Sequence, residues 1–131
     1  MNKAELVNEY QRVCKVLAIP PQQIVLGAGG ALMMLGLREQ TQDLDLSIPP
    51  EVFTALCAAS PEQAIEKSAT LTVFAISSLT DLHAQDTDGE IQQTEGVWHL
   101  TAEAVLAQKL SLNRPKDQQD ILNLQGYLCL F

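Results

Sequence analysis

The chain has 131 residues, of which 47% are hydrophobic and 5% aromatic, and its 16 acidic and 8 basic residues give a formal charge of −8. This length supplies one buried core and is too short for two ordinary domains, so we expect residues 1–131 to form a single domain. The acidic balance excludes broad non-specific binding to nucleic acid, although Lys109, Arg114 and Lys116 gather three of the basic residues in one short stretch.

The apolar residues are mostly Leu, Ala, Val and Ile, a composition that favours helices packed on a sheet and therefore an α/β fold. Cys14, Cys57 and Cys129 are widely spaced among apolar neighbours, so we expect buried thiols and a reducing, cytoplasmic compartment. No window has the length of a membrane span, and the sequence therefore predicts a soluble protein with no membrane partner.

The first half of the chain alternates between helical and extended patterns. Apolar residues recur at steps of three and four over Lys3–Leu17, which predicts a helix. The apolar run Gln23–Leu26 predicts a buried strand that leads into a glycine turn at Gly29-Gly30, followed by a helix over Ala31–Leu37. Strict alternation over Asp43–Ile48 predicts a strand with two different faces.

The second half begins with a helix from Pro49-Pro50 to about Ala58 and a short helix opened by Ser60-Pro61-Glu62-Gln63. Strands are expected at Leu71–Ile76, Thr80–Ala84 and 97–99, with Asp86, Asp88 and Gly89 marking a turn or exposed loop within 85–95. Thr101 should cap a helix that runs to about Leu112, and Pro115 should start the last helix. The three strands 23–26, 43–48 and 80–84 are expected to be neighbours, with the Gly29-Gly30 turn beside the second.

The most informative residues are Gly29, Gly30, Asp43 and Asp45. A glycine pair after a strand lets backbone amides approach phosphate oxygens closely. Two aspartates at positions i and i+2 of one strand lie roughly 6.5–7 Å apart at their Cα atoms, close enough to share hard, oxygen-seeking cations such as magnesium. The combination indicates phosphoryl chemistry.

In these residues the chain resembles the nucleotidyltransferase superfamily, whose motif is a Gly-Gly or Gly-Ser turn followed about a dozen residues later by Asp-x-Asp. Together with Ala31, Gly36, Arg38 and Thr41, the motif is most similar to the small bacterial and phage branch that includes nucleotidyltransferase toxins of type IV toxin–antitoxin systems. The stretch from Lys109 through Arg114 and Lys116-Asp117 to Asp120-Ile121 is similar to the C-terminal helix pair of that branch. The resemblance covers roughly residues 25–124 and implies a minimal nucleotidyltransferase fold, a mixed sheet flanked by helices.

The resemblance also implies a site. Asp43, Asp45 and a third carboxylate, for which Asp81 is our candidate, would hold Mg²⁺ or Mn²⁺ and act in catalysis, and Thr72 is the competing alignment for the third acid. Backbone amides at Gly29 and Gly30, with Arg38, Thr41 and Lys109, would bind the nucleoside triphosphate, ATP included. Gly30 stands where many members have a serine that contacts the triphosphate.

Some of these residues also have simpler interpretations. Asp117 and Asp120 are spaced to pair with Arg114 and Lys116 and to hold helix ends, and His83 and His99 are typical of partly buried strand histidines. We therefore weigh three functions: a metal-dependent enzyme that transfers a nucleoside monophosphate to an unidentified acceptor hydroxyl, an inactive nucleotidyltransferase-like binding or regulatory module, and a structural accessory protein. A homodimer or a cognate partner protein is compatible with all three.

Overall fold

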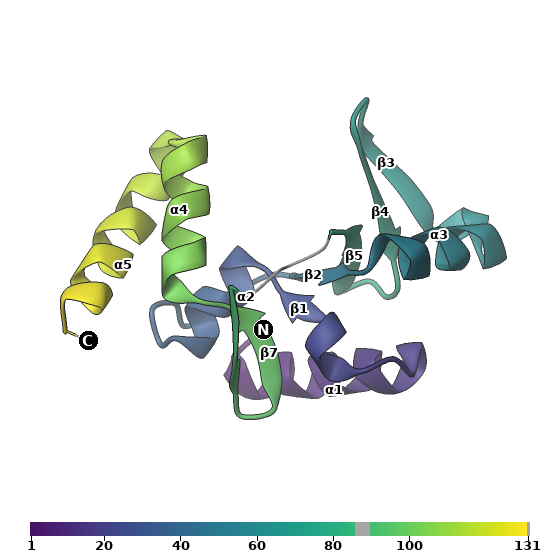
Figure 1. Ribbon diagram of the computed structural model, residues 1–131, viewed down its shortest axis with the longest axis horizontal. Helices are drawn as coiled ribbons and strands as arrows, with labels where there is room; N and C mark the ends of the chain where they lie inside the picture. Colours follow the sequence, from purple (N-terminus) through teal and green to yellow (C-terminus); the bar gives the residue numbers. More distant parts are fainter. Residues whose placement is uncertain (86–89, 131) are drawn as a thin grey trace.

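The computed structural model describes residues 1–85 and 90–130, which form an α/β fold with a mixed, open sheet (Figure 1). The α-helices are α1 (Lys3–Leu17), α2 (Ala28–Met34), α3 (Pro50–Ala59), α4 (Ala102–Leu112) and α5 (Gln118–Leu130). The strands are β1 (Val25–Leu26), β2 (Leu44–Ile48), β3 (Ala64–Ser68), β4 (Leu71–Ala75), β5 (Thr80–Ala84), β6 (Ile91–Thr94) and β7 (Val97–Leu100). Within the described ranges, no helix is long and apolar enough to cross a membrane.

The strand order is β3-β4-β5-β2-β1-β7-β6, which confirms that the three strands expected as neighbours lie together at the centre. β2 pairs with β5 in parallel and with β1 antiparallel, while β1 pairs with β7 in parallel. The outer strands are antiparallel, and Figure 1 shows β3 and β4 projecting from the body on the side opposite the α4–α5 pair. The specific placement of β2 between β1 and β5 decides where the candidate site forms.

Strand β2 divides the molecule into a core side and a polar side. Leu44, Leu46 and Ile48 are buried and pack with residues of α1 and α3, while Asp45 between them is exposed on the opposite face. A second apolar cluster joins α2 to the C-terminal helices and contains Ala31, Leu32, Ala102, Val105 and Leu124. Helix α2 thus contacts both clusters, and it connects the sheet to the helix pair.

Helix boundaries largely follow the expected capping chemistry. Asn2 and Glu5 form a capping box at the start of α1, and the Thr101 hydroxyl accepts the Ala104 amide at the start of α4. The Ser60 side chain forms no cap, and Pro61–Gln63 is a single 3-10 turn rather than a further α-helix.

Four local expectations were wrong. Pro21–Gln23 forms a 3-10 turn, which leaves only Val25–Leu26 as a strand. Helix α2 begins at Ala28, so Gly29 and Gly30 lie in its first turn and not in a loop before it. Residues 64–68 and 91–94 form edge strands that we did not expect, and Asp86, Asp88 and Gly89 lie outside the described residues. The cysteines are free but not fully buried, and Cys129 is exposed.

A buried carboxylate fastens α1 to the loop before β5. Glu9 is only 9% exposed, and its oxygens accept hydrogen bonds from Arg12, Ser77 and Thr80. The Arg12 guanidinium, with the two hydroxyls, lowers the pKa of Glu9 from 4.5 to about 2, against the opposing effect of burial.

We therefore expect Glu9→Gln to reduce the free energy of unfolding at pH 7 by about 1–3 kcal/mol, because charge-assisted hydrogen bonds are lost. A depressed folded-state pKa stabilises the protein above the unfolded-state value, and this stabilisation is lost as the pH falls from about 4.5 towards 2. The difference in free energy of unfolding between wild type and Glu9→Gln should accordingly become smaller over that pH range. Urea unfolding at several pH values measures it, with the exposed Glu39→Gln as a control that should show no such narrowing.

Candidate functional site

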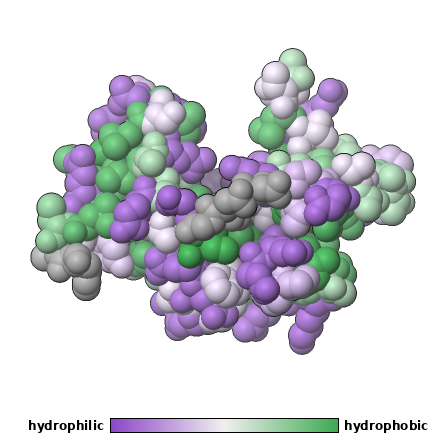
Figure 2. Space-filling model, viewed as in Figure 1, coloured by the Kyte–Doolittle hydropathy of each residue, from purple (hydrophilic) through white to green (hydrophobic). Residues whose placement is uncertain are grey.

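A cleft of about 910 Å³ lies between the polar face of the sheet and the C-terminal helices, and Figure 2 shows the surface hollowed there. The sheet side is formed by the start of α2, β2 and β5. The helix side is formed by α4, α5 and the turn between them. Gly29 and Gly30 line the cleft, and most of its other lining residues are polar: Arg38, Thr41, Asp43, Asp45, Ser47, His83, Gln85, Glu90, Gln108, Lys109, Arg114, Lys116, Asp117 and Asp120.

The parallel register of β2 and β5 determines which polar side chains are neighbours. Asp45 lies opposite Asp81, and Ser47 lies opposite His83. His83 Nε2 is 3.0 Å from Asp45 Oδ1, so the imidazole contacts the carboxylate across the two strands. Asp43 precedes β2 and is exposed in the same cleft. Asp43, Asp45 and His83 therefore line one cleft, and the last two are in contact.

Asp81 is the register neighbour of Asp45 but has a different partner. Its Oδ2 atom is 3.8 Å from Lys67 Nζ, and among described residues it does not line the cleft. Across 1–85 and 90–130, no three His, Cys, Asp or Glu side chains are close enough together to hold a metal ion. A three-carboxylate site thus requires the Asp81 side chain to turn towards Asp45.

The competing residue, Thr72, lies on β4. That strand is separated from β2 by β5, and Thr72 is exposed and paired with Glu66 of β3. Strand alternation also puts Thr72 on the same face as the buried Phe74. Of the two candidates for the third acid position, Asp81 is the one beside Asp45.

The two glycines of the motif face in different directions. The Gly27 amide donates to the Asp45 carbonyl at 2.8 Å, which joins the start of α2 to β2. A Cβ atom on Gly29 would lie 3.2 Å from Arg38 Nη1, whereas one on Gly30 would lie 2.5 Å from two carbon atoms of the buried Leu26. Gly29 therefore lets the Arg38 guanidinium lie close to the backbone at the edge of the cleft, while Gly30 permits close packing of α2 on β1.

The helix side of the cleft is organised around a buried lysine. Lys109 Nζ lies 3.1 Å from Asp117 Oδ1 and 3.2 Å from Asp120 Oδ2, and its side chain is 8% exposed. Arg114 binds Asp117 at 2.7 Å, and Arg38 binds Asp120 at 2.8 Å. The hydrogen bonds from Arg114 and then from Lys109 hold the pKa of Asp117 well below its usual range.

This arrangement changes the interpretation of the basic residues. Arg38 and Lys109 were expected to bind phosphate, and both line the cleft with their charges already paired. Their contact with a ligand stays a prediction, as does that of Thr41, whose hydroxyl donates to the Asp43 carbonyl. The structural role expected for Asp117 and Asp120 agrees with these ion pairs, although Asp120 contacts Arg38 and Lys109.

Sequence reasoning missed two contacts at this site. The contact of His83 with Asp45 could have been found from the sequence, because the i, i+2 spacing puts His83 on the same face of its strand as Asp81 and the two strands are adjacent. The contact between Lys67 and Asp81 had no such signal, because it depends on strand β3, which was not predicted. His99 is fully buried, hydrogen-bonds Thr94, and has a pKa lowered by burial, away from the cleft.

Comparison of the chain with protein-family models, with characterised proteins and with solved structures finds no match.

The contact between Gly30 and Leu26 gives a stability prediction. Gly30→Ala should lower the free energy of unfolding by about 1–3 kcal/mol, since the new methyl group overlaps a buried side chain. Gly126→Ala is the matched control, because Gly126 also lies in a helix, has open space around it, and should gain up to about 1 kcal/mol from helix propensity. Thermal unfolding compares the two, and equal stabilisation by both would contradict the packing argument.

The buried side chain of Lys109 gives a second stability prediction. Lys109→Met should lower the free energy of unfolding by about 3 kcal/mol or more, because two carboxylates lose the ammonium between them. Lys116→Met, at an exposed position in the turn between α4 and α5, should change stability by less than about 0.5 kcal/mol. Urea unfolding of both variants measures the difference, and similar values would show that the buried ion pairs do not hold the helix pair.

Proposed function

We propose that this chain is a metal-dependent nucleotidyltransferase that transfers a nucleoside monophosphate from a nucleoside triphosphate to an acceptor hydroxyl. One observation carries the proposal: Asp43 and Asp45 share a cleft with the glycine-containing start of α2, and Asp81 is the register neighbour of Asp45. The nucleotidyltransferase fold itself is part of this proposal, supported by the mixed central sheet and the C-terminal helix pair.

The donor chemistry of the site suits a hard divalent cation. Asp43 and Asp45 supply exposed carboxylate oxygens, the ligands that Mg²⁺ and Mn²⁺ prefer. Asp81 would join them as the third carboxylate. A bound cation would neutralise phosphate charge and polarise the phosphorus centre.

The chain's own residues would position the substrates. The triphosphate would lie beside Gly29 and the Arg38 guanidinium that packs on it, and Arg114 and Lys116 line the opposite side of the cleft. In the proposed reaction, the acceptor oxygen forms a bond to the α-phosphorus, the bond from that phosphorus to the bridging oxygen breaks, and pyrophosphate leaves. The hydroxyl proton passes to a carboxylate, for which we propose Asp81.

A second candidate function is a binding or regulatory module of the same fold without turnover. Two observations favour it: Gly30 packs against Leu26 where a serine would overlap it, and the described residues contain no converged group of three acids. Action within a toxin–antitoxin system or a phage, with a cognate partner protein, is proposed from the sequence resemblance alone. The acceptor is left open.

The first test is binding. Wild-type protein at a ligand concentration of about one hundred times Kd should gain roughly 2.7 kcal/mol in stability with Mg²⁺ or Mn²⁺ and a mixture of triphosphates, because the ligands bind the folded state only. Asp45→Asn should lose most of this stabilisation. Glu62→Gln changes an exposed charge that does not line the cleft, and it should keep the stabilisation. A thermal melt of each variant with and without ligands measures the stabilisation. If neither metal ions nor triphosphates stabilise the wild type, both candidate functions are contradicted.

The second test separates the two functions. Transfer of label from the α-phosphate of the triphosphate to an acceptor in a cell extract is expected of the enzyme and not of the binding module. Nucleotide binding without transfer, in an extract where a known nucleotidyltransferase does transfer label, would favour the module.

A further inference from the structure

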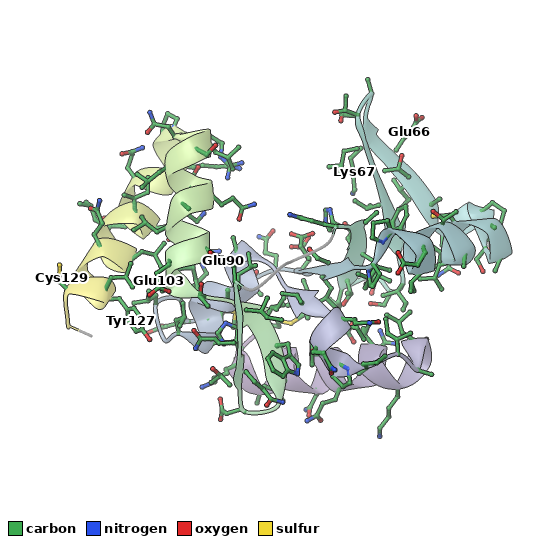
Figure 3. The ribbon with its side chains drawn as sticks, in the orientation of Figure 1. Glu66, Lys67, Glu90, Glu103, Tyr127 and Cys129 are labelled. Carbon is green, nitrogen blue, oxygen red and sulfur yellow. The ribbon has the colours of Figure 1, made fainter. Side chains whose placement is uncertain are left out.

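The projecting β3–β4 hairpin carries an irregularity at Lys67. Glu66 pairs with Thr72 and Ser68 pairs with Leu71, so Lys67 is an extra residue without a partner in the ladder. Such a bulge bends the strand locally and changes the direction of the side chain. Figure 3 shows Glu66 and Lys67 leaving the hairpin on opposite sides, with Lys67 on the side of the hollow.

The redirected side chain reaches past a whole strand. β4 lies between β3 and β5, yet Lys67 Nζ is 3.8 Å from Asp81 Oδ2 on β5. The side chain of Lys67 is 48% exposed and that of Asp81 is 25% exposed, so the pair lies at the protein surface, where water weakens but does not remove the attraction.

Asp81 and Asp45 are thus two adjacent carboxylates, each with a partner from the chain itself. Lys67 is the partner of Asp81, and His83 is the partner of Asp45. The Lys67 ammonium is thus close to the Asp81 carboxylate, and Asp81 is not among the residues that line the cleft.

We infer that Lys67 is a positioning residue that acts as the resident counter-ion of Asp81 and competes with a divalent cation for this carboxylate. The inference rests on the proposed function, since it assigns a role at the same site. Cation binding then requires Asp81 to leave Lys67 and turn towards Asp45. The strength of the Lys67–Asp81 contact therefore determines how much Asp81 contributes to the affinity for the cation.

Mn²⁺ alone, without nucleotide, is the probe, and its affinity is measured by calorimetry at one pH and one ionic strength. Lys67→Gln should bind Mn²⁺ about 2- to 5-fold more tightly than wild type, because a surface ion pair that competes with the cation is removed. Lys67→Arg keeps the charge and should bind as wild type does. Lys3→Gln removes a lysine of similar exposure that pairs with Glu95, and it should leave the affinity unchanged.

A double variant shows whether the effect passes through Asp81. Asp81→Asn should weaken Mn²⁺ binding, and adding Lys67→Gln to it should give no further change in affinity. If wild type binds Mn²⁺ through Asp45 but Lys67→Gln binds it equally or more weakly, the role of Lys67 is overturned and the proposed function stands. If Lys67→Gln and Lys3→Gln tighten binding equally, the effect is one of net charge and the inference is wrong. If neither wild type nor Lys67→Gln binds Mn²⁺, the inference fails together with the metal-dependent function.

Discussion

The buried ammonium of Lys109 is the contact on which the helix side of the cleft depends. It lies between Asp117 and Asp120, and these carboxylates reach out to Arg114 and to Arg38. Arg38 follows α2, so the network joins the C-terminal helices to the segment that leads into β2. The apolar cluster around Leu32 and Val105 packs α2 on α4, and the charges fix how the α4–α5 turn faces the sheet. Lys109 and Asp117 are almost inaccessible to water, so the charge of each is compensated by the neighbouring ions.

Strand β2 contributes one face to the core and the other face to the candidate site. Alternation along β2 puts Leu44 and Leu46 among the buried residues and Asp45 in the cleft, so packing of the apolar face determines the position of the carboxylate. On the core side, Glu9 binds Thr80 at the start of β5 and holds that strand where it pairs with β2. Interactions far from the cleft therefore set the geometry within it.

Sequence patterns predicted the parts of the fold that carry a strong period. The helix over Lys3–Leu17 and the strand over Thr80–Ala84 have the expected bounds, and β2 differs from its predicted range by one residue. Edge strand β3 was missed because four of its five residues are exposed and no alternation marks it; it is ordered by pairing with β4. The start of α2 at Ala28 was missed because glycines normally weaken a helix, while here close packing on Leu26 favours them.

For the candidate site, the sequence indicated which strands are neighbours but not which partners their side chains bind. Asp43, Asp45 and the strand neighbour Asp81 follow from periodicity and strand adjacency. The ion pairs of Lys67 and Arg38 depend on contacts between distant segments, 82 residues apart for Arg38 and Asp120, and no local pattern encodes them.

The parallel pairing of β2 with β5 also has a kinetic consequence. Leu44 pairs with Thr80, which lies 36 residues later, so the chain must close a long loop before this ladder forms. The β3–β4 and β6–β7 hairpins join strands across short connections and form locally, at a smaller entropic cost. Asp45 and Asp81 become neighbours only when the slower, long-range pairing is complete. Partly folded chains that contain only the two hairpins therefore lack the adjacent acidic pair.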